Sequence, residues 1–202
     1  MKLWVVPILH PAYILRGQAK EEPAQIRYLE RVKEISEHGW TTFDHTNPPQ
    51  GAILEPDLGD LFRWSTWIGR AGVTVDIETA NRKLRGIGFC RLDDCVPIWV
   101  PLCKQGGGPY WSGADLHTAQ GALGDILRNP NIPKWFHNGL GFDIPILRYN
   151  GYRVNGYAGD TMLMHHIMYP EMRKGLKYLA NLYLGIGGWK SLVTDDDEGE
   201  AK

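Results

Sequence analysis

Residues 73–80 read VTVDIETA, and their pattern predicts the first strand of the expected sheet. Branched apolar residues stand at alternate positions from Val73 onward, which is the pattern of a β-strand with one buried face. Asp76 and Glu78 occupy the other alternate positions, so both carboxylates point to the same face. Side by side they repel each other unless a cation is present. The strand therefore predicts a site as well as a core.

The overall composition indicates a folded protein without a strong charge bias. The chain has 202 residues, enough for one ordinary domain, and 43% of them are hydrophobic. A net charge of −1 argues against a protein that coats nucleic acid, but it allows an enzyme with a local site. Its three cysteines lack metal-ligand spacing, and no apolar run approaches transmembrane length. We therefore expect a cytoplasmic protein with reduced thiols and no membrane partner.

The chain divides into four segments. Residues 1–39 hold an apolar start and a charged amphipathic helix expected at about Pro23 to His38. Residues 40–60 are rich in Pro, Gly, Asp and Thr, which predicts a linker. Residues 61–187 carry an α/β pattern, and residues 188–202 form an acidic tail predicted to be disordered.

The α/β segment begins with three expected strands, VTVDIE, RGIGFCRL and VPIWVPL, which predict an antiparallel meander with a turn at Asp93–Asp94. The later elements are expected as a helix near 115–127, a strand at 132–138, a helix from about 142, an extended piece at 152–160, and helices near 161–168 and 175–184. Strands followed by α/β alternation predict a mixed sheet flanked by helices, with a short N-terminal extension.

A second motif, WFHNGLGFDIPIL, spans residues 135–147. Its strand is expected to end at Phe136, Asn138 is expected to cap the next helix, and Asp143 lies in that helix's first turn. The carboxyl ends of strands are where α/β sheets bind ligands. A third carboxylate here predicts a site for Mg²⁺ or Mn²⁺, and two such ions about 4 Å apart would serve phosphoryl transfer.

VTVDIETA resembles the first motif of the DEDD superfamily of 3′–5′ exonucleases, D-x-E, and HNGLGFD resembles its second, N-x-x-x-F-D. The stretch YAGDTMLMHHIMYPEMRKGLKYLANLYLG resembles two helices of the proofreading domains of family A DNA polymerases. Together these motifs extend over roughly residues 66–187. The resemblance implies an RNase H-like fold and the removal of nucleotides from the 3′ ends of single-stranded DNA with two divalent metal ions.

The resemblance also implies roles for individual residues. Asp76, Glu78 and Asp143 would be catalytic and would bind the metal ions, and Glu78 would also orient the attacking water. The residues implied to contact nucleic acid are Thr79, His137, Asn138 and Phe142. Asp160 precedes a helix and is predicted to cap that helix or to contact the metal-binding residues without binding metal itself.

Two features predict a piece of a larger protein. The superfamily's last motif, Tyr-x-x-x-Asp or His-x-x-x-x-Asp, does not occur after Asp160, so we expect a truncated and weak exonuclease. Near the start, PILHPAYILR resembles the His-Pro-x-x-x-Leu-Arg motif of phage and bacterial uracil-DNA glycosylases. Residues 1–39 would then be a glycosylase remnant unable to excise uracil. A DNA polymerase, or the missing parts of a fusion, would be partners in a bacterial or phage-infected cytoplasm.

Alternatives from other classes stay open. The chain could be a non-catalytic nucleic-acid-binding or assembly fragment of a replication protein, or an exoribonuclease of the RNase D type. An RNase would need contacts to the 2′-hydroxyl, and a pure binder would release no nucleotides. Trp64, Trp67 and Trp99 are predicted to fill the core, and His165 and His166 to be packed or solvated.

Overall fold

The computed structural model describes residue 16 and residues 22–38, 51–104 and 106–184. The chain forms two compact units. One is Pro48–Met164, and the other combines Met1–Asn47 with His165–Lys202. The His10 motif, the acidic tail and most of the expected linker lie outside the described residues.

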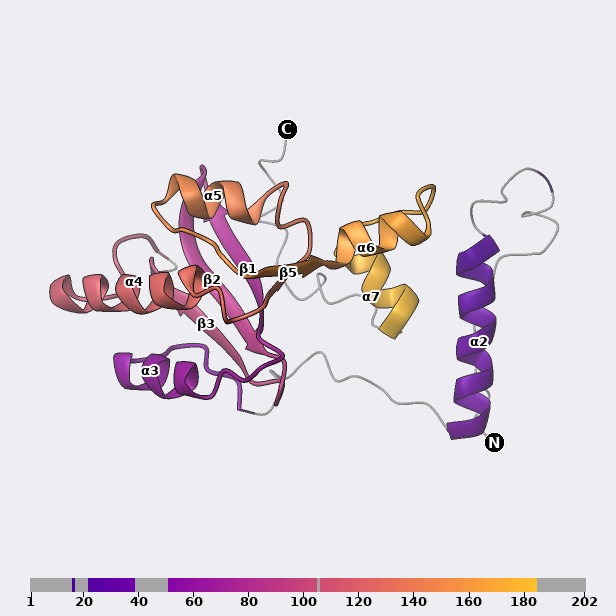
Figure 1. The fold of residues 1–202 in the computed structure, drawn as a ribbon, viewed down its shortest axis with the longest axis horizontal. Coiled ribbons are helices and arrows are strands. Elements are labelled where there is room, and N and C mark those ends of the chain that lie inside the picture. The colour runs from indigo at the N-terminus through magenta and orange to yellow at the C-terminus, as the bar shows by residue number, and fades with distance from the viewer. Residues whose placement is uncertain (1–15, 17–21, 39–50, 105, 185–202) are drawn as a thin grey trace. The chain divides into compact units, whose positions relative to one another are not determined.

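The larger unit is built on a five-stranded sheet with the order β3-β2-β1-β4-β5 (Figure 1). The strands are β1 (Val73–Ala80), β2 (Lys83–Arg91), β3 (Pro97–Pro101), β4 (Lys134–Phe136) and β5 (Tyr157–Asp160). The first three pair antiparallel, whereas β4 runs parallel to β1 and β5 runs parallel to β4. The predicted meander and mixed α/β sheet are confirmed, in agreement with an RNase H-like fold.

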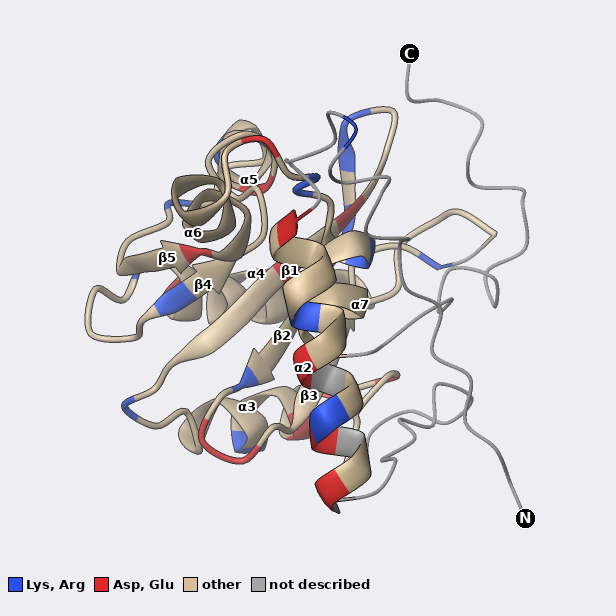
Figure 2. Ribbon diagram, turned by 90° about the vertical axis from the view of Figure 1, so that its right-hand side faces the viewer, with Lys and Arg blue, Asp and Glu red and all other residues tan. Residues whose placement is uncertain are grey.

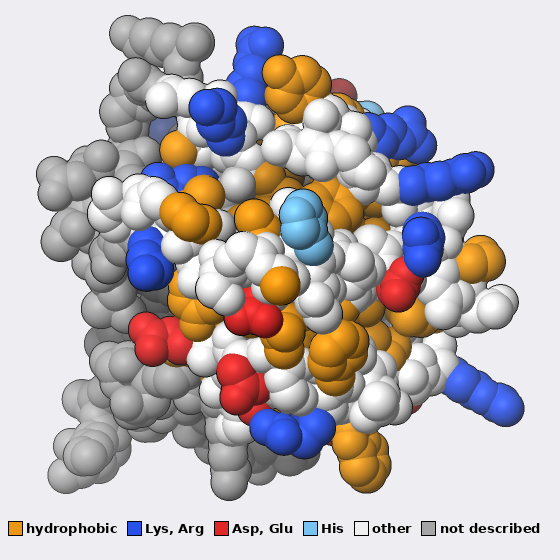
Figure 3. Space-filling model, turned by 90° about the vertical axis from the view of Figure 1, so that its left-hand side faces the viewer, with side chains coloured by type: hydrophobic (Ala, Val, Ile, Leu, Met, Phe, Trp, Pro, Cys, Tyr) orange, Lys and Arg blue, Asp and Glu red, His pale blue; other side chains and the backbone are white. Residues whose placement is uncertain are grey.

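The core lies on one face of this sheet. It combines alternate residues of β1, β2 and β3 with side chains of α3 (Leu58–Thr66), α4 (Gly113–Arg128) and α5 (Asp143–Tyr149). Figure 1 shows α3 and α4 on the same side of the strands, and Figure 3 shows that side of the molecule, with Lys and Arg side chains spread out rather than gathered.

Of three tryptophans predicted to fill the core, only Trp64 does so, at 2% exposure. Trp67 is 71% exposed at the end of α3. Trp99 is half-buried and is not part of the core cluster, because its position alternates with the buried Ile98 and Val100.

The segment expected to be a linker contains structure. Helix α3 begins at Leu58, and Asp57 caps it through a reciprocal pair of hydrogen bonds with Asp60 of 2.7 and 3.2 Å. Ile53 bridges to β3, donating its N–H to Pro97 O and accepting from Trp99 N. Residues from Ile53 onward are therefore structured, where an irregular linker was expected, because Ile53 pairs with β3 and Asp57 caps α3.

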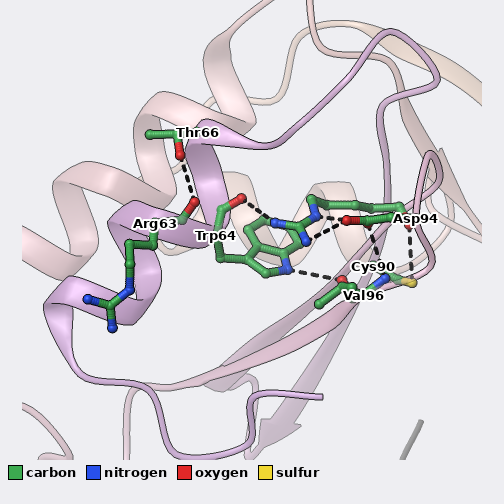
Figure 4. Close-up of polar contacts among 7 residues, drawn as sticks. Arg63, Trp64, Thr66, Cys90, Asp94 and Val96 are labelled. Atoms are coloured by element: carbon green, nitrogen blue, oxygen red, sulfur yellow. Dashed lines mark hydrogen bonds and ion pairs between the residues drawn. The ribbon is translucent and has the colours of Figure 1, made fainter. Parts of the chain in front are cut away.

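Arg91, a buried residue at the end of β2, is hydrogen-bonded to α3, and Figure 4 labels its partners Trp64 and Asp94. The Arg91 guanidinium donates to both carboxylate oxygens of Asp94, at 3.0 and 2.7 Å, and to Trp64 O at 2.9 Å. It also lies 5.3 Å from the centre of the Trp64 ring, while Trp64 Nε1 donates to Val96 O. These contacts lower the pKa of Asp94, mainly through its hydrogen bonds from Arg91.

The turn between β1 and β2 is tight. Asn81 and Arg82 have φ of 51° and 62°, and Ala80 pairs directly with Lys83. Positive φ at both central residues is the signature of a type I′ hairpin turn. Just before it, the pairing shifts register between Glu78 and Thr79, which increases the local twist beside the acidic pair.

The smaller unit is helical. It contains α2 (Glu22–His38), the second half of α6 (Thr161–Met168) and α7 (Leu176–Leu184), packed around Ala24, Met172 and Leu182. Acidic and basic residues alternate along α2 (Figure 2), and Arg27 pairs with both Glu30 and Glu34 at 3.2 Å. The segment 61–187 thus does not form one unit, because residues from His165 onward group with α2. None of the described helices is long and apolar enough to cross a membrane.

Candidate active site

The parallel strands bring three polar segments to one edge of the sheet. Val73 of β1 pairs with Lys134 of β4, and Phe136 of β4 pairs with Asp160 of β5. The carboxyl ends of β1, β4 and β5 therefore meet at the same edge. Asp76 and Glu78 approach it along β1, the second motif follows β4, and Asp160 ends β5.

Asp143 is the buried acid of this edge. It is the first residue of α5 and only 2% exposed. Burial, followed by the negative charge of Asp76, raises the pKa of Asp143 to about 7. In the described part of the chain its Oδ1 atom has no hydrogen-bond partner. A buried carboxylate oxygen without a donor, next to a second carboxylate, suits a divalent cation.

Asp76 and Glu78 lie on the exposed face of β1, opposite the core, as the alternation predicts. Asp76 is close enough to Asp143 to raise its pKa, so the structure brings these two acids together. Among the described residues, however, no three Asp, Glu, His or Cys side chains form a group that could hold a metal ion. The predicted three-carboxylate cluster is thus not preformed in the described residues, and Asp76 and Asp143 are the pair that supports a metal site.

Asp160 holds the edge together. Its Oδ1 accepts hydrogen bonds from the N–H groups of Asn138, Met162 and Leu163 at 3.0, 2.9 and 3.3 Å, and its Oδ2 accepts from Gly139 N at 2.7 Å. The carboxylate is 2% exposed. It therefore caps the first turn of α6 and at the same time fixes the loop after β4. With four N–H donors, its oxygens are occupied by the protein itself.

The loop between β4 and α5 is shaped by backbone geometry. Asn138 has φ of 66°, and its carbonyl accepts from Gly141 N and Phe142 N. A Cβ at Gly141 would lie 2.4 Å from Asn138 Oδ1, so a larger residue there would push the Asn138 side chain aside. The expectation that Asn138 caps the next helix is wrong, because the N-cap of α5 is Phe142, without a side-chain hydrogen bond.

The residues implied to contact nucleic acid surround this edge. His137 Nδ1 lies 2.8 Å from Thr161 Oγ1, which joins the end of β4 to the start of α6. Phe142 is 44% exposed on the loop, and Thr79 follows Glu78 at the register shift. Leu140, which the sequence did not single out, is 55% exposed beside Phe142. The loop thus presents two apolar side chains to solvent next to the acids.

Comparison with known proteins agrees with this picture. A family model described as 3′–5′ exonuclease matches residues 73–198. A comparison with curated protein sequences found no match. RNase D of Trypanosoma brucei, in complex with GMP, is a structural neighbour with 14% identity and a TM-score of 0.53, over 71% of this chain and 44% of that one.

Two further structures illustrate the range of neighbours. RNase D of Escherichia coli has 18% identity and a TM-score of 0.51, over 69% of this chain and 34% of its own. Pol1 of M. smegmatis, in complex with DNA primer-template and dNTP, has 23% identity and a TM-score of 0.49, over 68% of this chain and 23% of its own. At this identity the RNase D neighbours establish the fold alone. The chain spans less than half the length of each of these three proteins.

Proposed function

Because the chain belongs to the 3′–5′ exonuclease family, a family that generally uses divalent metals, we propose that it removes nucleotides from the 3′ ends of single-stranded DNA with two divalent metal ions. The observation that carries the proposal is the pairing of the buried Asp143 with Asp76, together with Oδ1 of Asp143, which has no donor among the residues that the structure describes. A bound cation would offset the repulsion between the Asp76 and Asp143 carboxylates and would give Oδ1 of Asp143 a partner.

Each residue at the edge has a definite task in this proposal. Asp76 and Asp143 would hold the divalent ions, which supply an activated water and stabilise the leaving oxygen. Glu78 shares the exposed face of β1 with Asp76, which suits it to accept a hydrogen bond from the attacking water. Asp160 keeps the loop after β4 in place, and Phe142 on that loop would pack against the substrate strand.

The test is a 3′-end degradation assay on 5′-labelled single-stranded DNA with Mn²⁺ or Mg²⁺. We expect products shortened from the 3′ end, no products with EDTA, and a loss of about 10²-fold or more in Asp76→Asn and Asp143→Asn. Asp125→Asn, an exposed change on α4, is the matched control and should keep full activity.

The same assay with an RNA strand of the same sequence tests whether the enzyme prefers deoxyribose or ribose in its substrate. If RNA is degraded faster than DNA, and both variants abolish this activity, the protein is an exoribonuclease and the proposal of a DNA exonuclease is wrong. Binding of either strand without any metal-dependent shortening would contradict catalysis and support a nucleic-acid-binding fragment.

A further inference from the structure

The sheet face that carries the acidic pair has an unusual neighbour strand. In the ladder between β1 and β2, Asp76 lies opposite Gly88 and Glu78 lies opposite Gly86. Both partners of the two acids are therefore glycines, which leave the surface beside the carboxylates without side chains. In the next ladder, Gly88 lies opposite Trp99 of β3.

The Trp99 ring fills the space over these glycines. A Cβ on Gly86 would lie 2.4 Å from Trp99 Cζ2 and 2.6 Å from Cη2, and one on Gly88 would lie 3.6 Å from Cε3. The six-membered ring therefore lies across β2, from the level of Asp76 toward the level of Glu78. Since neighbouring strands are about 4.8 Å apart, the ring rests roughly one strand away from the acidic pair.

This indole is not a core residue. It is half-buried, and it belongs neither to the hydrophobic core cluster nor to the partly buried residues packed against it. An aromatic ring that covers a strand glycine can be purely structural, since it shields the exposed backbone. Shielding of the backbone accounts for the contact with Gly86. It does not explain why Gly88, opposite Asp76, is also a glycine, or why the ring extends toward the end of β1 that carries the acids.

We propose that Trp99 is a stacking platform for a nucleobase next to the scissile phosphate. The inference rests on the proposed function, which places the phosphate at Asp76 and Asp143. A nucleotide held there would lay a neighbouring base over β2, where the Trp99 ring covers Gly86 and Gly88 and is the partly exposed aromatic surface beside the acids. Stacking of this kind accepts any base, which suits an enzyme that removes nucleotides irrespective of sequence.

The chain contains a matched control on the same face. Trp135 of β4 pairs with Thr74 and lies over Gly159, where a Cβ would be 2.7 Å from Cζ3. Its Nε1 donates to Ala71 O, before the start of β1, so its ring is directed away from the acidic end. Trp135 is thus a half-buried tryptophan over a glycine in the purely structural role.

The experiment measures coupling between the indole and the base. Binding of 5′-labelled single-stranded DNA to the full chain is followed by fluorescence anisotropy in Ca²⁺, for the unmodified chain, Trp99→Leu and Trp135→Leu. Each protein is tested with a natural 3′ end and with an abasic residue at the last or the penultimate position. Because no hydrolysis is needed, an inactive enzyme and an absent platform give different results.

We expect Trp99→Leu to weaken the binding of DNA with a natural 3′ end about ten-fold. The same substitution should weaken the binding of at least one of the two abasic DNAs by less than about two-fold. Trp135→Leu should affect all ends alike. An equal loss for natural and abasic ends in Trp99→Leu, or the same coupling in Trp135→Leu, would overturn the proposal. If Trp99→Leu does not fold, Trp99→Phe serves instead: a loss of about three-fold confined to natural ends supports the platform, and an equal loss on all ends refutes it.

Discussion

Asp143→Asn should stabilise the metal-free protein at neutral and alkaline pH. The fold raises the pKa of this carboxyl from 3.8 to about 7, first by burial and then by the charge of Asp76. The native chain therefore binds this proton more tightly than the unfolded chain does. The corresponding stability is fully present below pH 3.8 and is lost as the pH rises through about 7.

The size of the effect follows from the shift. Roughly three pH units at 1.36 kcal/mol each set an upper limit of about 4 kcal/mol for the loss of unfolding free energy between pH 4 and pH 8. Asparagine has nearly the same shape but does not titrate. The variant should therefore be about 2–4 kcal/mol more stable than the unmodified chain at pH 8 and close to it at pH 4.

Urea unfolding in EDTA at pH 4 and at pH 8 measures this difference, with Asp125→Asn as the exposed control. Addition of Mn²⁺ at pH 8 should raise the stability of the unmodified chain and leave Asp143→Asn nearly unchanged, because only the unmodified chain keeps the buried carboxylate that pairs with Asp76. Equal stability of the two proteins at both pH values would show that the pKa of Asp143 is not raised in the folded protein, and the argument for a cation beside it would fail.

Three further changes test other parts of the structure. Asp160→Asn should cost about 2–4 kcal/mol in urea unfolding, because fewer of the N–H groups it accepts would stay paired; a cost below about 0.5 kcal/mol would contradict the capping role. Burial lowers the pKa of Lys134 from 10.5 to about 8, so stability should rise between those pH values by up to about 3 kcal/mol, and Lys134→Met should remove the rise; a rise that persists would place its origin elsewhere. Arg82→Gly creates the preferred Asn-Gly turn and should raise the unfolding free energy by about 0.5–1 kcal/mol, whereas a lower melting temperature would argue against a type I′ turn.

The regular elements of the larger unit were predictable because their patterns are periodic. The alternation in VTVDIETA gives β1, and the spacing of the two motifs brings Asp76 and Asp143 to one edge. Helix α3 was missed because its cap, Asp57, stands among Pro and Gly residues typical of loops. The grouping of residues from His165 with α2 depends on long-range packing, which local pattern does not contain.

The finer features of the site depend on backbone geometry. Asparagine is a residue type that often caps helices, but the positive φ of Asn138 makes it part of a turn, so helix α5 begins only at Asp143. The misassignment of Trp99 came from judging tryptophan by size. Alternation with Ile98 and Val100 along β3 already places it on the face opposite the core. Strand period was therefore the better guide than residue type.

The connectivity of the sheet also has a kinetic consequence. Strands β1, β2 and β3 are joined by short connections, so their pairing closes only small loops. Strand β4, and with it Asp143, follows α4 in the chain, so its docking against β1 closes a much longer loop and is expected later. We expect the late docking step to push one carboxylate toward another and to be slow above pH 7. Refolding followed by stopped-flow fluorescence should then be faster with Mg²⁺ in the unmodified chain, but not in Asp143→Asn, and an equal acceleration in both would place the ion's effect elsewhere.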